Sequence, residues 1–304
     1  MPSWERFTSA VISLTSIESS CRYVTLPVYS EPLSDLAAQA YQLSDRLCES
    51  CRDLHALWPY IRLSRSSTGV EVEGSQLTHV LRRLIADGRR DLLIAGAADT
   101  GLLTLVTRAG AGHFVNIAVL DICETPLELC RRLAKQWSMP IETLREDLRE
   151  LNVRQQFDLI LVHGTLHFID ESGRLRAVRR MRDSLRPNGR MVLLFNTSKA
   201  RALKAEDNVH AEYAAAVLRE LKHQHVPLPD NEAIIYDRLA AHSRRRQLRE
   251  GAFVNPIDAK LLLETAGLKA ISCDQINVRL SSEAAGFVTR ISKQRFMVVA
   301  EPKS

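Results

Sequence analysis

Short apolar runs alternate with helical patterns through the middle of the chain, and this alternation constrains the fold more than any other feature. The runs expected to be strands are Asp91–Ala95, Asn116–Leu120, Ile141–Leu144, Phe157–Val162 and Arg190–Phe195. Apolar residues at helical spacing lie between them, and such alternation is typical of βαβ units with helices on both faces of a parallel sheet. We therefore predict an α/β fold with a doubly wound, mostly parallel sheet. Two later runs, Ala270–Leu280 and Arg295–Glu301, are expected to add an antiparallel edge.

Regions before and within this alternation are predicted to be helical. From Leu36 to Trp58 apolar residues recur every three or four positions, which predicts one amphipathic helix capped by Ser34 and followed by Pro59. A second, short helix is expected at 75–85. We divide the chain into a helical N-terminal cap region at 1–85 and a core at 86–304, which contains a helical lid insertion at about 199–255. Candidate lid contacts are Tyr23, Tyr29, Tyr41, His210, Tyr213 and Tyr236.

The composition is that of a soluble globular protein. Of the 304 residues 45% are hydrophobic and 25% charged, and no apolar run approaches the ~18 residues expected of a membrane span. The N-terminus lacks the basic start and continuous apolar stretch of a secretory signal. We therefore expect a cytoplasmic protein with no membrane partner.

The basic residues are mostly arginines, which account for 33 of the 41 positive side chains, and the net charge is +5. One group, at 174–186, belongs to a helix whose apolar stripe is expected to face the sheet, so these arginines are predicted to face solvent. Another group, at 244–249, falls in the lid, where it is placed to meet an acidic substrate. Because no RNA-binding module and no interleaving of aromatic and basic residues accompanies them, a nucleic-acid partner is disfavoured.

The chain has six cysteines, and only Cys48 and Cys51 form a close pair. No second cysteine pair and no histidine pair completes a zinc set along the sequence, so no metal ligand is predicted. We interpret the pair as ordinary packing or surface thiols in a reducing compartment.

A glycine-containing loop, Ile94–Gly101, joins the first strand to the following helix and is the most informative segment. Backbone amides of such a turn, together with the helix N-terminus, attract a polar ligand. A nucleoside triphosphate is excluded, because Leu102 and Leu103 stand where a phosphate-binding loop requires Lys and Ser or Thr. The methyl group of Ala98 opposes close approach of a dinucleotide pyrophosphate. S-adenosylmethionine has no pyrophosphate, so it remains a candidate ligand for this loop.

Carboxylates follow the second and third expected strands. Asp121 ends the second strand, where a carboxylate can accept hydrogen bonds from both ribose hydroxyls of a dinucleotide or of S-adenosylmethionine. After the third strand, the segment Arg145–Leu148 carries acidic side chains that can accept a hydrogen bond from an adenine amino group. Together with the loop, these positions indicate a site for an adenosyl ligand.

Taken together, five segments resemble the class I S-adenosylmethionine-dependent methyltransferases in order and spacing. They are DLLIAGAADTG (91–101), VLDICETPLELCRRLA (119–134), REDLREL (145–151), FDLILVHGTLHFI (157–169) and LRPNGRMVLLF (185–195). The resemblance implies a Rossmann-like fold with a seven-stranded sheet and S-adenosyl-L-methionine as cofactor. It implies cofactor-binding roles for Gly96, Ala97, Asp99, Gly101, Asp121, Ile122, Asp147, Leu148, His163 and Gly164. The family usually has a denser glycine pattern and an acid where Ala95 stands.

His163 and His167 follow the fourth strand, at the sheet edge where ligands of open α/β sheets bind, and are the candidate catalytic residues. The two-part cap favours an enclosed pocket, hence methyl transfer to an O or N nucleophile of a small-molecule acceptor. An RNA or protein methyltransferase, a non-catalytic S-adenosylmethionine-binding relative and a nicotinamide-dependent oxidoreductase are the alternatives. The sequence leaves open whether two copies of the chain form a homodimer.

Overall fold

The computed structural model describes residues 30–66, 70–110, 113–114, 116–197, 207–248, 253–276 and 294–303. Its centre is a seven-stranded sheet in the order β3-β2-β1-β4-β5-β7-β6. The strands are β1 (Asp91–Ala95), β2 (Asn116–Asp121), β3 (Glu142–Arg145), β4 (Phe157–His163), β5 (Leu185–Thr197), β6 (Leu268–Ile276) and β7 (Gln294–Pro302). Pairing is parallel from β3 through β5, whereas β7 runs antiparallel to both β5 and β6. The predicted α/β fold class is confirmed.

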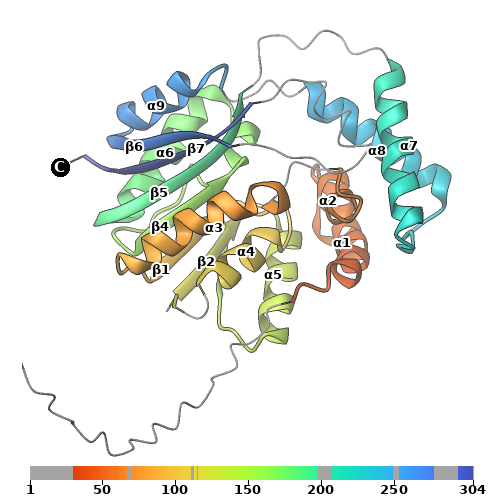
Figure 1. Ribbon diagram of the computed structural model, residues 1–304, viewed down its shortest axis with the longest axis horizontal. Helices are drawn as coiled ribbons and strands as arrows, with labels where there is room; N and C mark the ends of the chain where they lie inside the picture. The colour runs from red at the N-terminus through yellow and green to blue at the C-terminus, as the bar shows by residue number, and fades with distance from the viewer. Residues whose placement is uncertain are drawn as a thin grey trace, which may run out of the picture.

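Helices cover both faces of the sheet (Figure 1). One layer holds α3 (Val70–Ala86), α4 (Gly101–Gly110) and α5 (Glu124–Gln136), and the other holds α6 (Glu171–Ser184) and α9 (Pro256–Thr265). Successive residues of β1 supply the two cores in turn: Leu92 and Ile94 pack with the first layer, Leu93 and Ala95 with the second. Burial on both faces explains why the central strands are continuous apolar runs rather than alternating ones.

The remaining four helices form a separate apolar cluster beside the sheet (Figure 1). They are α1 (Leu33–Leu47), α2 (Arg52–Leu63), α7 (Asp207–His223) and α8 (Glu232–Leu248). Polar contacts join the two pairs, since Arg238 lies 2.9 Å from Asp53 and 4.7 Å above the Tyr41 ring. Arg245 of the lid also pairs with Asp53. None of the helices in the described ranges is both long and apolar enough to cross a membrane.

Two sequence expectations differ from the structure in this region. The single helix predicted up to Trp58 is two helices separated at Cys48–Cys51, and Pro59 lies inside α2 rather than beyond it. Helix α3 is longer than predicted and packs on the sheet, so within the described part of 1–85 it is α1 and α2 that share an apolar cluster with α7 and α8. The candidate lid contacts Tyr23 and Tyr29 and the ends of the insertion lie outside the described residues.

Candidate active site

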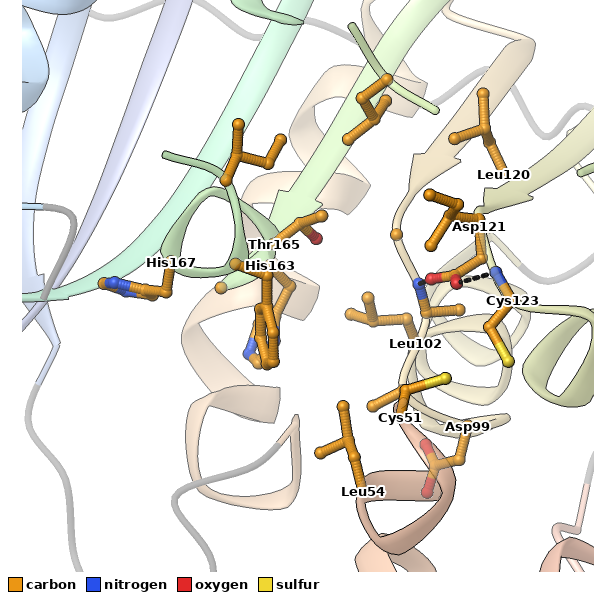
Figure 2. A pocket seen from close by; sticks show the side chains of 18 of the residues that line it. Cys51, Leu54, Asp99, Leu102, Leu120, Asp121, Cys123, His163, Thr165 and His167 are labelled. Atoms are coloured by element: carbon orange, nitrogen blue, oxygen red, sulfur yellow. Dashed lines mark hydrogen bonds between the residues drawn. The ribbon is translucent and has the colours of Figure 1, made fainter. Parts of the chain in front are cut away.

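The carboxyl ends of β1, β2 and β4 open into a cavity of about 530 Å³ (Figure 2). Its walls come chiefly from five segments distant in sequence: the glycine loop after β1, the turn after β2, the loop after β3, the short 3-10 helix η1 (Thr165–Phe168) after β4, and one face of α2. The parallel register places the ends of β1 and β2 side by side, Ala95 opposite Leu120, which brings both following loops to one edge. This edge is where ligands of open α/β sheets bind.

The glycine loop approaches η1 too closely for any side chain at its first position. Gly96 has a φ of +89°, and a Cβ there would lie 2.2 Å from Oγ1 of Thr165. Thr165 is held in place because its hydroxyl donates to the Ala95 carbonyl oxygen at 2.9 Å. Gly96 therefore serves both the left-handed backbone and the contact between loop and η1. Its predicted place in the ligand loop fits its position on the cavity wall.

Asp121 joins the glycine loop to the turn after β2. Its Oδ2 accepts a hydrogen bond from the Ala97 backbone N–H at 2.9 Å, and its Oδ1 accepts one from the Cys123 N–H at 2.8 Å (Figure 2). Burial raises the pKa of this carboxyl, and the two N–H donors offset part of that rise. Each oxygen keeps lone pairs for a ligand hydroxyl on the cavity side, as expected for a ribose acceptor.

Asp99 links the glycine loop to α2. It is buried and accepts from Arg62 at 2.6 Å and from the Gly101 N–H at 2.8 Å. Arg62 of α2 also pairs with Glu31 at 2.8 Å, and Glu31 accepts from the Thr100 hydroxyl at 2.5 Å. Burial raises the pKa of Asp99, and Arg62 counteracts this only in part. The predicted ligand residue Asp99 thus ties the loop to α2, although it also lines the cavity.

The predicted adenine end of the site has an apolar and a polar component. Ile122 is a large aliphatic side chain with 63% of its surface exposed, and it lines the cavity together with the buried Leu148. Asp147 lines the same wall, but it pairs with Arg149 at 2.6 Å, which lowers the pKa of Asp147. The apolar lining and the Asp121 carboxylate suit the two halves of an adenosyl group, a flat ring and a diol.

His163 ends β4 and is held by a buried carboxylate that sequence reasoning missed. Its Nε2 lies 2.5 Å from Oε2 of Glu73, a residue of α3 without solvent exposure. Glu73 also pairs with Arg295 of β7. Burial alone raises the pKa of Glu73, but its interactions with His163 and Arg295 outweigh it and hold that pKa below its usual range. No sequence spacing links residues 73, 163 and 295.

The second candidate catalytic histidine is engaged differently. Nε2 of His167 accepts a hydrogen bond from the Asn196 backbone N–H at 3.1 Å, and its ring meets Phe253 edge-on at 6.2 Å. His167 lines the cavity, yet Figure 2 shows its ring directed away from Asp121. Gly164, between the histidines, adopts a φ of +68° that turns the chain into η1.

The cap contributes residues that the sequence did not single out. Trp58, Leu54 and His55 of α2 line the cavity. Among the candidate lid contacts within the described ranges, Tyr41, Tyr213 and Tyr236 instead belong to the apolar cluster between α1, α2, α7 and α8, and the buried His210 bonds to Ser243 at 3.0 Å. Leu54 and Trp58 lie on the apolar stripe that the sequence shows, but nothing in the sequence places that stripe beside the glycine loop.

Comparison with known proteins agrees with this geometry. Residues 95–189 match a family described as a methyltransferase domain. A carboxy-S-adenosyl-L-methionine synthase from Glaesserella parasuis serovar 5 is 28% identical over 116 residues, a match covering 36% of this chain and 46% of the relative. The chain thus matches less than half the length of this curated relative.

Two solved structures are similar to the chain, and the first of them supports the likeness of fold. The 1,6-didemethyltoxoflavin-N1-methyltransferase of Burkholderia thailandensis, with S-adenosylhomocysteine bound, has 15% identity and a TM-score of 0.51, covering 90% of this chain and 92% of that one. The N-methyltransferase NodS of Bradyrhizobium japonicum, also with S-adenosylhomocysteine, has 17% identity and a TM-score of 0.47, covering 88% and 100%. Residues 95–189 thus match a methyltransferase domain, and the sheet with its helices has the fold of a structure that holds S-adenosylhomocysteine.

Proposed function

We propose that this protein methylates an O or N nucleophile of a small molecule, with His163 as the general base. The observation that carries the proposal is the pairing of His163, which lines the cavity, with the buried carboxylate of Glu73 behind it. Glu73 occupies Nε2, and within the described part of the chain no hydrogen bond occupies Nδ1 of His163. A hydroxyl or protonated amine needs a base to become a nucleophile, and imidazole is suited to that role near neutral pH.

When bound, S-adenosylmethionine supplies an electrophilic methyl group. Asp121 would hold the ribose, Ile122 and Leu148 would contact the adenine, and the loop from Gly96 would face the amino-acid portion. His163 accepts the proton of the nucleophile at Nδ1, while Glu73 fixes the ring orientation and stabilises the resulting imidazolium. Glu73 is therefore a positioning residue, and α2 excludes water from above the loop.

The enclosure of the cavity supports a small acceptor rather than a polymer. Five residues of α2 or its N-cap reach the wall opposite the glycine loop, and α2 is itself packed against both lid helices. A polymer substrate would have to enter past this cap. Arg245, from the basic group of the lid, pairs with Asp53 and is not among the cavity-lining residues. The basic group thus gives little support to an RNA acceptor.

The test begins with calorimetric titration of S-adenosylmethionine, S-adenosylhomocysteine and NAD, followed by transfer of labelled methyl groups. We expect binding of both adenosyl ligands, no binding of NAD, and label on amine or hydroxyl compounds rather than on bulk RNA or protein. His163→Gln should lower kcat about 10²–10⁴-fold with unchanged affinity for S-adenosylhomocysteine. His167→Gln, the matched control on the same wall, should change kcat little. Cofactor binding without transfer to any acceptor would favour the non-catalytic alternative, and labelled RNA or protein the polymer alternative.

A further inference from the structure

Three cysteines and a histidine converge at the junction between the cap and the core. Cys48 and Cys51 flank the break between α1 and α2, His55 lies in the first turn of α2, and Cys123 is the N-cap of α5. One ligand atom from each of the four lies within 4.8 Å of all the others, and the Sγ atoms of Cys48 and Cys123 are 3.4 Å apart. Spacing along the sequence predicted no partners for the Cys48–Cys51 pair, whereas the fold supplies two.

The orientation of His55 suits metal ligation. Its Nδ1 lies 2.9 Å from the Ala98 carbonyl oxygen, which can only accept, so the hydrogen of the neutral ring resides on Nδ1. Nε2 then carries the lone pair of the ring and is the atom left to join the three sulfur atoms of the cluster. Metal-binding histidines usually have this outer contact, a backbone carbonyl that fixes the tautomer and the ring plane. His55 is 3% exposed and Cys123 is buried, whereas Cys48 and Cys51 are partly exposed.

We propose that Cys48, Cys51, His55 and Cys123 bind one structural zinc ion. Three thiolates and one imidazole form a Cys₃His set, which is a common tetrahedral zinc site. Zn–S distances of about 2.3 Å place two sulfur ligands about 3.8 Å apart, within the observed spread of the ligand atoms. Thiolate ligands with tetrahedral spacing favour zinc over oxygen-preferring cations such as Mg²⁺. Four protein ligands leave no open position for a reacting molecule, so the site is structural.

The zinc site would fasten the cap to the cofactor edge of the sheet. Two ligands belong to the α1–α2 connection and one to α2, whereas Cys123 follows β2. The Cys123 N–H donates to Asp121, so fixing Cys123 also fixes the proposed ribose acceptor. Cys51, His55 and Cys123 line the cavity. The site stands on the ligand geometry alone and does not depend on the proposed methyl transfer.

Metal content tests the proposal directly. The full chain is purified under reducing conditions from zinc-supplemented culture and examined by plasma mass spectrometry, with one zinc per chain expected. Replacement by Co²⁺ should give the visible absorption of a tetrahedral site and thiolate-to-metal charge-transfer bands in the near ultraviolet. Cys48→Ser and His55→Ala should reduce retained zinc at least tenfold after dialysis. Cys273→Ser, which removes a half-buried thiol on β6, should retain one zinc per chain.

Two further measurements keep the test decisive if a variant folds poorly. His55→Cys should still bind one zinc, because four thiolates also form a tetrahedral site, and circular dichroism should show native structure. Wild-type protein stripped by chelator under reduction should regain one equivalent of zinc and unfold at higher temperature once reloaded. The proposal is overturned if reduced wild-type protein binds no zinc, if its thiols form a Cys48–Cys123 disulfide under these conditions, or if Cys48→Ser retains full zinc.

Discussion

Replacing Asp121 by Asn tests the proposed ribose acceptor while leaving the rest of the cavity wall unchanged. The carboxylate accepts from Ala97 N–H on one oxygen and from Cys123 N–H on the other. An amide has only one oxygen, so its NH₂ group must face one of the two donors. Loss of one hydrogen bond to a charged acceptor costs about 1.5–3 kcal/mol. The same loss applies to one ribose hydroxyl, which corresponds to roughly 10- to 150-fold weaker binding of S-adenosylhomocysteine.

A matched control exists at the opposite end of the sheet. Asp158 also accepts from two backbone N–H groups, Arg90 at 3.0 Å and Asp91 at 3.1 Å, and is paired with Arg186 at 2.9 Å. Both backbone N–H groups donate to Oδ2, so in Asp158→Asn the amide oxygen can keep them while the NH₂ group faces Arg186. This variant also loses one charged hydrogen bond, yet its affinity for S-adenosylhomocysteine should be unchanged. Calorimetry gives the Kd of each variant and urea unfolding the stability. Wild-type affinity in Asp121→Asn, or equal weakening in Asp158→Asn, would refute the assignment of Asp121.

The pH dependence of cofactor affinity provides a second readout for Asp121. Because burial raises the pKa of this carboxyl above its ordinary value of about 3.9, acidification removes an acceptor at a higher pH than for an exposed aspartate. As the pH is lowered, the affinity for S-adenosylhomocysteine should thus begin to fall while the pH is still above 4. A folded-state pKa that is raised means that protonation of this group does not itself favour unfolding. Loss of affinity should therefore precede loss of structure, as monitored by circular dichroism.

Three further predictions concern the cavity walls. Gly96→Ala should lower the free energy of unfolding by roughly 2–5 kcal/mol, from the left-handed backbone and the clash with Thr165; a change below about 0.5 kcal/mol in urea unfolding would contradict this. The lowered pKa of the Glu73 carboxyl stabilises the fold above its unfolded pKa of about 4.3, and this stability is lost as the pH falls through the folded pKa. The urea midpoint of Glu73→Gln should therefore depend less on pH in the acid range than that of the wild type. Ile122→Ser should leave stability within about 0.5 kcal/mol but weaken S-adenosylhomocysteine about 5- to 30-fold by calorimetry; unchanged affinity would remove Ile122 from the adenine site.

The strands of the sheet were predictable because burial on both faces leaves a strong local signal. β1, β2 and β4 begin where the apolar runs begin, and the antiparallel β6–β7 edge was also predicted correctly. The break between α1 and α2 was not, and the reason is geometric. Four residues are close to one helical turn, so an interruption at Cys48–Cys51 leaves the three-and-four spacing in phase on both sides.

The site was predictable only where its residues adjoin the strands that position them. Asp121 and His163 lie at strand ends, so their place at one sheet edge follows from parallel pairing. Glu73 lies 90 residues from His163, and Cys123 75 residues from Cys48. Contacts over such separations depend on how α2 and α3 pack, which hydrophobic periodicity does not encode. The sequence marks these residues only by their type, as an acid or a thiol in a helical pattern.

The sharing of one apolar cluster by α1, α2, α7 and α8 has a consequence for biosynthesis. Tyr41 and Arg238, which contact each other across this cluster, are 197 residues apart. Helices α1 and α2 precede β1 in the chain, whereas α7 and α8, with which they share the cluster, follow β5. Contacts between such distant segments form late because the intervening loop must be closed first. The side of α1 and α2 that packs on α7 and α8 is therefore expected to stay uncovered until β1 through β5 have been synthesised.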